Sequence, residues 1–458
     1  MAQKPSIPKG TRDFSPSEVA KRNYIFDIIK NQFKTFGFQP IETPSFENLD
    51  TLLGKYGDEG DRLIFKILNS GDFLSKVAPD VFEEKDSSLL TPKITEKALR
   101  YDLTVPFARY VVMHQNELEF PFKRYQMQPV WRADRPQKGR FREFYQCDAD
   151  VVGANSLLQE VELLQLYDAV FADLNLDGVV IKINHRKILS GIAEVIGAHE
   201  QLIAFTVALD KLDKIGKEGV VEEMLKNGIS AEAVEKARPL LADSSKDLDA
   251  LQLLKDFLKD SEEGTKGIEE LEFITHTIHS LGLKTTQVAI DITLARGLNY
   301  YTGVIFEVAA PPTVAMGSIG GGGRYDDLTG IFGLKNLSGV GISFGLDRIY
   351  LVLEELGLFP KTIDQSVQVL FVNFGAAEAL AALRLAGSLR SKGIKTDLYP
   401  TDTKIQKQMK HANNRNIPYV ILLGEQELAN ESFVVKDMEK GDQKTYSWAD
   451  IDSFANLL

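Results

Sequence analysis

At residues 131–146 the chain runs Trp131-Arg132-Ala133-Asp134-Arg135-Pro136-Gln137-Lys138-Gly139-Arg140-Phe141-Arg142-Glu143-Phe144-Tyr145-Gln146. Two β-like runs, Phe122 to Gln128 and Phe144 to Val152, flank this polar, arginine-rich, glycine-containing stretch. The pattern predicts a β-hairpin with a long charged loop. The strands would hold Arg132 at a fixed depth, while the loop would carry mobile cations.

Basic residues concentrate in two islands of an otherwise acidic chain of 458 residues, whose net charge is −12. Residues 123–142 carry seven basic residues against one acid, and residues 379–424 carry eight against two. The islands suggest two local sites for anionic ligands, although each charge run could equally be a solvated face. The negative total argues against nucleic-acid binding over the whole surface.

Hydrophobic periodicity organises the first half of the chain. It predicts a helix over Val19 to Phe36, an extended segment over Phe38 to Pro44 and an amphipathic helix over Leu157 to Leu174. From about Lys187 to His279 the chain is rich in Glu, Lys, Leu and Ala, which predicts an inserted helical module. Its helices are expected to be separated at Gly228, Pro239 and Gly264.

Strand character returns after this module, at Val288 to Val308. A glycine-rich turn is predicted at Gly320 to Gly323, and a strand-to-helix step at Ser338 to Glu355. Beyond a linker at Gly357 to Asp364, strands and helices alternate in the order Val367–Val372, Ala376–Lys392, Thr396–Tyr399, Lys404–Arg415 and Tyr419–Leu423. This βαβαβ order predicts a small parallel sheet with helices on its faces.

Several function classes find no support in the sequence. No G-x-x-x-x-G-K-[ST] segment is present, and no strand runs into G-x-G-x-x-G. The single cysteine, Cys147, excludes an intramolecular disulfide framework, and His276 and His279 lack a third metal ligand nearby. Met1 to Gly10 lacks an apolar signal core, and no stretch approaches the ~20 apolar residues of a membrane span. We therefore expect a cytoplasmic protein with no dedicated metal site and no membrane partner.

Six segments together point to a known family. Residues 131–146 resemble motif 2 of class II aminoacyl-tRNA synthetases in its histidyl form. Gly37-Phe38-Gln39-Pro40-Ile41-Glu42-Thr43-Pro44 resembles motif 1, and Gly341-Ile342-Ser343-Phe344-Gly345-Leu346-Asp347-Arg348 resembles motif 3. Ala295-Arg296-Gly297-Leu298-Asn299-Tyr300-Tyr301-Thr302-Gly303 and Gly321-Gly322-Gly323-Arg324-Tyr325-Asp326 resemble the two histidine-specific motifs of histidyl-tRNA synthetases. Pro8-Lys9-Gly10-Thr11-Arg12-Asp13 also fits that family.

The resemblance covers nearly the whole chain and implies an α+β fold with a class II catalytic domain built on an antiparallel sheet. It implies a catalytic core in two parts, residues 1–187 and 281–360, separated by a helical insertion at 188–280. It also implies an α/β anticodon-binding domain at 365–458. The implied activity joins L-histidine to tRNA(His), through an adenylate formed from ATP with release of pyrophosphate. A homodimer is implied as well.

The resemblance assigns catalysis to Arg132, Arg296 and Arg348, and ATP binding to Arg132, Asp134, Arg140 and Arg348. Mg²⁺ would arrive with the nucleotide. Arginine suits this task because its planar fork binds two oxygens and stays charged. The substrate carboxylate is already ionised near neutral pH, so activation needs no general base.

By the same carry-over, a further set of residues would bind histidine: Asp102, Thr104, Gln146, Asp150, Arg296, Tyr300, Tyr301 and Tyr325. Here Arg100-Tyr101-Asp102-Leu103-Thr104 stands where many bacterial members carry R-P-E-G-T, so the acid is one methylene shorter. The tRNA would contact the hairpin loop and the basic C-terminal helix, at Gln137, Lys138, Lys404, Lys407, Lys410 and Arg415.

Three alternatives to an active histidine–tRNA ligase stay open on the sequence. The chain could be a non-catalytic relative that binds histidine and regulates another enzyme, or an RNA-sensing module built on the same fold. It could also be a synthetase for another amino acid with the same C-terminal domain. Retention of Arg132, Arg296 and Arg348 argues against the RNA-sensing module, and the C-terminal domain and the first histidine-specific motif argue against the regulator.

Overall fold

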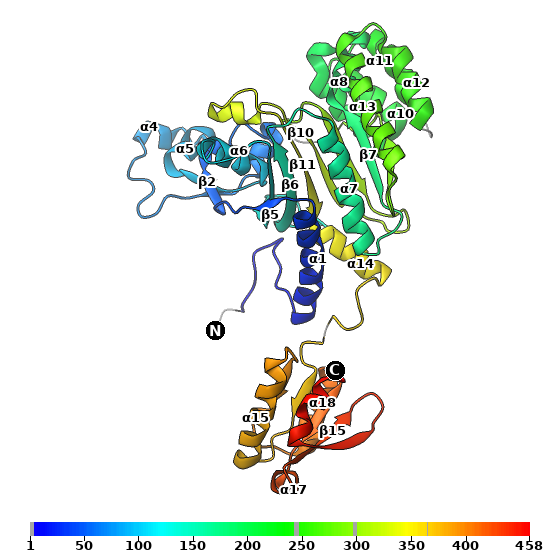
Figure 1. Ribbon diagram of the computed structural model, residues 1–458. Helices are drawn as coiled ribbons and strands as arrows, with labels where there is room; N and C mark the ends of the chain where they lie inside the picture. Colours follow the sequence, from blue (N-terminus) through cyan, green and yellow to red (C-terminus); the bar gives the residue numbers. More distant parts are fainter. Residues whose placement is uncertain (1–3, 242–246, 296–299, 364) are drawn as a thin grey trace. The chain divides into compact units, whose positions relative to one another are not determined.

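The computed structural model describes residues 4–241, 247–295, 300–363 and 365–458. The chain forms two compact units (Figure 1). One contains Met1–Phe14 and Arg22–Phe359, and the other contains Ser15–Lys21 and Pro360–Leu458. None of the helices in the described ranges combines the length and apolar character needed to cross a bilayer.

The first unit is built on an eight-stranded sheet with the order β1-β5-β6-β11-β10-β9-β7-β8. β1 pairs with β5 and β7 with β8 in parallel, and every other pairing in this sheet is antiparallel. The strands are β1 (Gln39–Pro40), β5 (Phe122–Trp131), β6 (Glu143–Val152), β7 (Val180–His185), β8 (Gln287–Ile290), β9 (Val304–Ala309), β10 (Gly320–Arg324) and β11 (Gly339–Gly345). The predicted hairpin is confirmed as β5 and β6.

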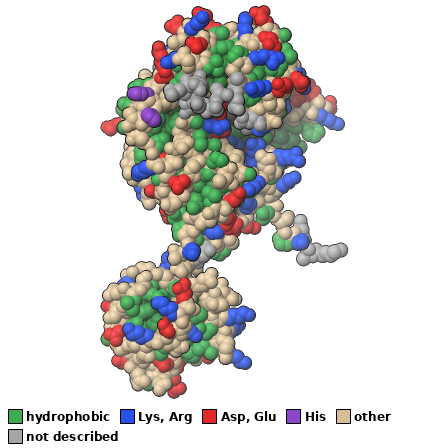
Figure 2. All heavy atoms as spheres, turned by 90° about the vertical axis from the view of Figure 1, so that its right-hand side faces the viewer, with side chains coloured by type: hydrophobic (Ala, Val, Ile, Leu, Met, Phe, Trp, Pro, Cys, Tyr) green, Lys and Arg blue, Asp and Glu red, His purple; other side chains and the backbone are tan. Residues whose placement is uncertain are grey.

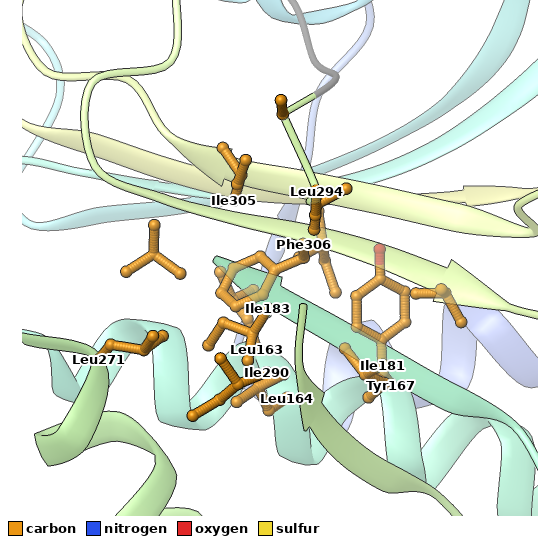
Figure 3. Close-up of a cluster of buried hydrophobic side chains, with 14 of the residues drawn as sticks. Leu163, Leu164, Tyr167, Ile181, Ile183, Leu271, Ile290, Leu294, Ile305 and Phe306 are labelled. Atoms are coloured by element: carbon orange, nitrogen blue, oxygen red, sulfur yellow. The ribbon is translucent and has the colours of Figure 1, made fainter. Parts of the chain in front are cut away.

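One face of this sheet is apolar and covered by helices. In β6, Cys147, Ala149 and Val151 belong to the main buried core, whereas the alternate residues Gln146, Asp148 and Asp150 are polar. Helices α1 (Pro16–Thr35), α7 (Leu158–Asp173) and α14 (Leu346–Leu356) supply apolar side chains to this core. Figure 3 shows part of it, where side chains of α7, β7, β8 and β9 meet. The polar residues are thereby left on the opposite face.

The glycine run was expected to form a turn, and that prediction is wrong. Gly320–Gly323 lie inside β10, in the middle of the sheet, between β9 and β11. A side chain at Gly322 would overlap the carbonyl of Gly341 on the neighbouring strand, and one at Gly320 would lie 3.1 Å from the ring of Tyr167. The glycines are therefore required by close packing rather than by a turn.

The helical module follows β7 directly. It consists of α8 (Arg186–Ile196), η1 (His199–Gln201), α9 (Leu202–Leu209), α10 (Leu212–Lys226), α11 (Ala231–Ala237), η2 (Arg238–Leu241), α12 (Asp247–Leu258) and α13 (Glu262–Leu281). Gly228 and Pro239 lie outside its α-helices as predicted, but Gly264 lies within the first turn of α13. At this point α8 approaches α13 closely, because a Cβ added to Gly191 would lie 2.6 Å from the Cα of Gly264.

A smaller three-stranded sheet, β2-β4-β3, lies between the first helix and the hairpin in sequence. This region contains β2 (Phe46–Asn48), α2 (Leu49–Leu52), α3 (Gly57–Leu63), β3 (Lys66–Ile67), α4 (Pro79–Glu83), α5 (Ser87–Ile94), β4 (Lys97–Leu99) and α6 (Thr104–Met113). β4 leads directly into residues 100–104, so it sets the position of Asp102. A short η3 (Leu328–Phe332) separates β10 from β11.

The second unit has a five-stranded sheet with the order β13-β12-β14-β15-β16. Its elements are β12 (Val369–Phe371), α15 (Ala376–Ser391), β13 (Thr396–Leu398), α16 (Ile405–Asn414), β14 (Tyr419–Leu422), α17 (Glu425–Ala429), β15 (Ser432–Asp437), β16 (Gln443–Ser447), η4 (Trp448–Asp450) and α18 (Ile451–Ala455). The first three strands are parallel as predicted, but β15 and β16 extend the sheet antiparallel. The sheet is therefore mixed rather than parallel. The overall α+β architecture, with an antiparallel main sheet and a separate C-terminal domain, is confirmed.

The contact between α8 and α13 makes a testable prediction about stability. We expect Gly191→Ala to lower the free energy of unfolding by about 1–3 kcal/mol, because the added methyl group overlaps the backbone of α13. Gly387→Ala in α15 is the control. Apart from the backbone of its own helix, no atom of the part of the chain that the structure describes lies within 4 Å of its added Cβ, so the variant should gain about 0.5–1 kcal/mol of helix stability. Calorimetry of both variants checks this, and an unchanged Gly191→Ala protein would contradict the close approach.

Candidate active site

A pocket of about 280 Å³ opens beside the hairpin loop. The loop contributes Arg132, Asp134, Gly139, Arg140 and Phe141 to its lining. The remaining lining residues come from β6, β10, β11, the start of α14 and the segments beside them: Phe144, Tyr145, Gln146, Tyr301, Ser318, Ile319, Gly320, Gly321, Ser343, Gly345, Asp347 and Arg348. Six residues predicted from the sequence therefore meet in one cavity: Arg132, Asp134, Arg140, Gln146, Tyr301 and Arg348.

The two described catalytic candidates are held by backbone carbonyls. Arg132 Nε donates to the carbonyl of Tyr101 at 3.0 Å, and its guanidinium lies 4.3 Å from the centre of the Tyr101 ring. Arg348 Nε donates to the carbonyl of Gly139 at 2.8 Å, and its Nη1 donates to the carbonyl of Ser318 at 2.5 Å. These contacts orient the cations without neutralising them. The third candidate, Arg296, lies outside the described residues.

The hairpin loop closes on itself at its tip. Gln137 and Arg140 form a β-bridge, with both backbone amides donating across it. Arg140 Nη1 lies 3.9 Å from Asp134 Oδ1, which is a loose ion pair. Lys138 is exposed and its Nζ lies 3.0 Å from Glu355 Oε2. Arg140 and Asp134 thus face the pocket, whereas Lys138 lies on the surface.

Asp102 lies in a buried cluster with two tyrosines. Its Oδ1 accepts the Tyr56 hydroxyl at 2.8 Å, and its Oδ2 accepts the Tyr300 hydroxyl at 2.9 Å. Burial raises the pKa of Asp102, and the bonds from the tyrosines and the nearby Arg132 oppose that rise. Thr104 follows as the first, buried residue of α6. Nothing in the sequence indicated that Tyr56 belongs to the site, because it lies outside every family motif.

Asp150 and Tyr325 form a second buried cluster. The Tyr325 hydroxyl donates to Asp150 Oδ1 at 2.6 Å, and Arg124 Nη2 lies 2.8 Å from Asp150 Oδ2. The ring of Tyr300 lies 6.1 Å from that of Tyr325 and 5.0 Å from that of Tyr301, which joins both clusters to the pocket. The predicted histidine-binding residues within the described ranges are therefore neighbours in space.

Asp148 is a residue that the sequence reasoning missed. It lies between Gln146 and Asp150 on the polar face of β6, only 2% exposed. Burial raises its pKa, Arg124 opposes the rise, and Asp150 adds to it. The sequence could have indicated Asp148, because every second residue of a strand points to the same face, and residue 148 lies between the predicted site residues 146 and 150. Gln146 Nε2 donates to Ser343 Oγ at 3.2 Å, and its buried Oε1 has no hydrogen-bond partner within the described ranges.

The predicted tRNA-contacting cations of the second unit lie on or beside α16. Gln408 and Ala412 form the buried face of this helix, while Lys404, Lys407 and Lys410 are exposed. Arg415 differs, because it pairs with Asp397 Oδ2 at 3.4 Å and donates to Ser366 Oγ at 3.1 Å. On the face shown in Figure 2, basic and acidic side chains are intermixed rather than gathered by sign.

Comparison with known proteins matches both units to one kind of enzyme. A family model for histidyl-tRNA synthetase matches residues 91–349, and a model for an anticodon-binding domain matches residues 366–456. The chain is 67% identical to the histidine–tRNA ligase of Christiangramia forsetii and 64% identical to that of Flavobacterium johnsoniae, with 97% of each chain covered in both cases. A crystal structure of histidyl-tRNA synthetase from Nostoc sp. aligns over 100% of both chains, at 32% identity and a TM-score of 0.81.

The buried carboxyls make a prediction about pH. The folded protein holds the Asp148 proton more tightly than the unfolded chain, whose aspartates titrate near 3.8. Ionisation of Asp148 therefore costs stability as the pH rises above about 4. We expect Asp148→Asn to gain stability relative to the parent protein between pH 4.5 and pH 7.5, by on the order of 1–2 kcal/mol.

Asp168→Asn is the matched control for this experiment. Burial disfavours ionisation of Asp168, but amide hydrogen bonds from Lys284, Thr285 and Thr286 lower its pKa, so it stays ionised above pH 4.5. Its loss should cost the same free energy at every pH in this window. Urea unfolding at four pH values measures both differences, and a pH-independent difference for Asp148→Asn would show that Asp148 takes up no proton.

Proposed function

We propose that this chain, which belongs to the histidyl-tRNA synthetase family, forms histidyl-adenylate in the pocket beside the hairpin loop and transfers the histidine to tRNA(His). The chain is a histidine–tRNA ligase by its likeness to the curated ligases over nearly its whole length. One observation carries the location of the chemistry. Arg132 and Arg348, distant in the sequence, line the same pocket, next to buried carboxylates and tyrosines.

Adenylate formation requires that two anions come together. The histidine carboxylate attacks the α-phosphorus of ATP, the α–β phosphoanhydride bond breaks, and pyrophosphate leaves with its electron pair. Positive groups that are already oriented lower the barrier, because they stabilise the charge that develops on phosphoryl oxygens. In our proposal Arg132 holds the α-phosphate, and Arg296 contacts the α-phosphate and the histidine carboxylate from the other side. Arg348 and Arg140 reach the γ-phosphate, with Arg348 stacking on adenine and Asp134 close to it.

Mg²⁺ would be held chiefly by the phosphates. Among the residues that the structure describes, those lining the pocket include two carboxylates, Asp134 and Asp347. Asp347 accepts hydrogen bonds from Arg12, Arg22 and the amide of Tyr145, so its oxygens are engaged. A magnesium ion needs six oxygen ligands, more than these carboxylates can supply, so the ion would arrive with ATP. When bound, it would neutralise charge on the leaving pyrophosphate.

Histidine recognition rests in this proposal on the buried polar clusters. Asp102 and Thr104 would hold the ammonium group, and Gln146 and Asp150 would contact the amino acid. Tyr300, Tyr301 and Tyr325 would surround it. The buried Oε1 of Gln146, which has no hydrogen-bond partner among the described residues, supports this assignment, because it offers an acceptor to a substrate N–H. An amino acid without polar atoms in its side chain would leave these groups unpaired, which favours strong discrimination.

For the transfer step, the terminal ribose hydroxyl of tRNA attacks the adenylate carbonyl. The bond between the carbonyl carbon and the phosphate oxygen breaks, AMP leaves, and a phosphate oxygen of the adenylate takes up the hydroxyl proton. The exposed loop tip with Gln137 and Lys138 would face the acceptor end of the tRNA. In the second unit, the exposed lysines of α16 would contact tRNA phosphates, together with Arg415. We also propose a homodimer, on the resemblance of residues 37–44 to the motif that builds the dimer interface in this family.

The most direct test is ATP–pyrophosphate exchange measured with each of the twenty amino acids. We expect exchange with histidine alone. Exchange driven by proline, threonine or glycine would identify a different synthetase. Histidine binding without exchange would identify a non-catalytic relative, and tRNA binding without aminoacylation would identify an RNA-sensing module.

The exposed lysines of α16 make a separate prediction. We expect Lys407→Glu combined with Lys410→Glu to weaken tRNA binding at least tenfold and to flatten its dependence on salt, by about 0.7–0.9 in log–log slope per lost phosphate contact. Histidine-dependent exchange should be unchanged. Lys440→Glu with Lys444→Glu changes the net charge equally and is the control, because Lys440 lies in the turn after β15 and Lys444 lies in β16. Equal weakening by both pairs would contradict a specific contact through α16.

A further inference from the structure

The N-terminal segment 9–14, here called the strap, lies against the base of the hairpin loop. The carbonyl of Gly10 accepts the amide of Arg142 at 2.9 Å. At Gly10 the backbone is left-handed (φ 88°), and an added Cβ would lie 2.8 Å from Cγ of Arg142 and 3.0 Å from Cγ of Pro136. The strap thus approaches both sides of the loop at Gly10, where the positive φ and the close neighbours leave room for glycine but not for a larger residue.

Arg12 is the strap residue that joins two parts of the pocket wall. Its guanidinium carbon lies 3.3 Å from the centre of the Phe141 ring, and its Nη2 donates to Asp347 Oδ1 at 2.5 Å. Phe141 belongs to the loop and Asp347 to the first turn of α14, and both line the pocket. A planar guanidinium can stack on a ring and bind a carboxylate in the same pose, which an ammonium group cannot do.

These contacts complete a closed circuit around the pocket. Asp347 is followed directly by Arg348, whose Nε donates to the carbonyl of Gly139 in the loop. Gly139 is close in sequence to Phe141, and Phe141 lies under Arg12, which returns to Asp347. The position of the loop relative to Arg348 is therefore set at two points, by Arg348 itself and by Arg12.

Asp347 does not depend on Arg12 for a partner. Arg22 Nη1, from α1, also donates to Asp347 Oδ1 at 2.5 Å, and the amide of Tyr145 donates to Oδ2 at 3.2 Å. Loss of Arg12 would leave the carboxylate paired and α1 in place. The specific loss would be the link between α14 and the loop.

We propose that the strap is a positioning element for ATP and that Arg12 is its positioning residue. By clamping Phe141 to Asp347, Arg12 holds the loop cation Arg140 and the α14 cation Arg348 at the separation that a triphosphate requires. Arg12 itself does not line the pocket and touches no reacting atom. The inference rests on the proposed function, because it assigns ATP to this pocket.

The test compares Arg12→Ala with a matched control, Arg109→Ala. Arg109 pairs with Glu47 at 2.7 Å, its side chain is 20% exposed, and Glu47 is 6% exposed. The corresponding values for Arg12 and Asp347 are 26% and 5%. Both variants therefore remove one partly buried arginine from a buried carboxylate, but only Arg12 touches the loop. Gly10→Ala, which should push the strap away from the loop, provides a second variant.

The measurements are histidine-dependent pyrophosphate exchange, with KM determined separately for ATP and for histidine, and direct ATP binding by calorimetry. For Arg12→Ala and Gly10→Ala we expect KM for ATP and Kd for ATP to rise about tenfold, the scale of one misaligned charged contact to phosphate. KM for histidine should change less than about threefold, and Arg109→Ala should resemble the parent protein. Arg12→Lys should restore a positive charge beside Asp347 but not the stacking of a planar group on the Phe141 ring, so KM for ATP should stay raised.

Three results would overturn the positioning role. One is an unchanged KM for ATP in Arg12→Ala that still unfolds at the parent's temperature. Another is an equal rise of both KM values in Arg12→Ala and Arg109→Ala, which would indicate general loss of structure. The third is a parental KM for ATP in Arg12→Lys, which would show that the contact with Phe141 does not contribute to ATP binding. Failure of the proposed function is distinct, since the parent protein itself would then show no histidine-dependent exchange.

Discussion

The two faces of the eight-stranded sheet impose the constraint on which the site depends. Side chains alternate between the two faces along a strand. Because β6 buries Cys147, Ala149 and Val151 in the core with α7 and α1, it must direct its alternate residues to the other face. These are Gln146, Asp148 and Asp150. The apolar face anchors the strands, and it fixes the polar face with the same precision. A shift of one residue in the register of β6 would exchange the two faces and destroy both core and site.

Buried polar groups on that second face are costly unless they are paired. Arg124 on β5 faces Asp150 across the hairpin and is close enough to influence Asp148, so one cation serves two buried carboxyls. Tyr325 donates a hydrogen bond to Asp150, and Tyr300 donates one to Asp102. The cost of this arrangement is offset by the large apolar core behind the sheet. The benefit is that donors and acceptors are already oriented when a polar substrate arrives.

The glycines of β10 connect packing to the site. Gly320 makes room for the ring of Tyr167, which lies on the helix-covered face and donates its hydroxyl to the carbonyls of Gly321 and Ser343. Gly323 makes room for the ring of Tyr301, because an added Cβ would lie 2.9 Å from it. A strand without side chains is weak by propensity, but here it is held between β9 and β11 and allows aromatic rings to approach closely.

Local patterns in the sequence were sufficient for the hairpin, for the helices predicted over Val19 to Phe36 and Leu157 to Leu174, for the helical module and for the first three strands of the C-terminal sheet. Periodicity and turn residues are local properties, so these elements could be recognised without knowledge of their neighbours. The motif residues Arg132, Asp134, Arg140, Gln146, Tyr301 and Arg348 could be assembled from family resemblance alone, and they do line one pocket.

Long-range packing decided what the local patterns could not. The glycine run was read as a turn, because nothing in Gly320–Gly323 itself reveals that Gly341 and Tyr167 occupy the space of its missing side chains. Tyr56 and Arg12 gained their significance only when distant segments met: Tyr56 at Asp102, and Arg12 between Phe141 and Asp347. Such contacts join residues up to 335 positions apart, and only the folded chain brings them together.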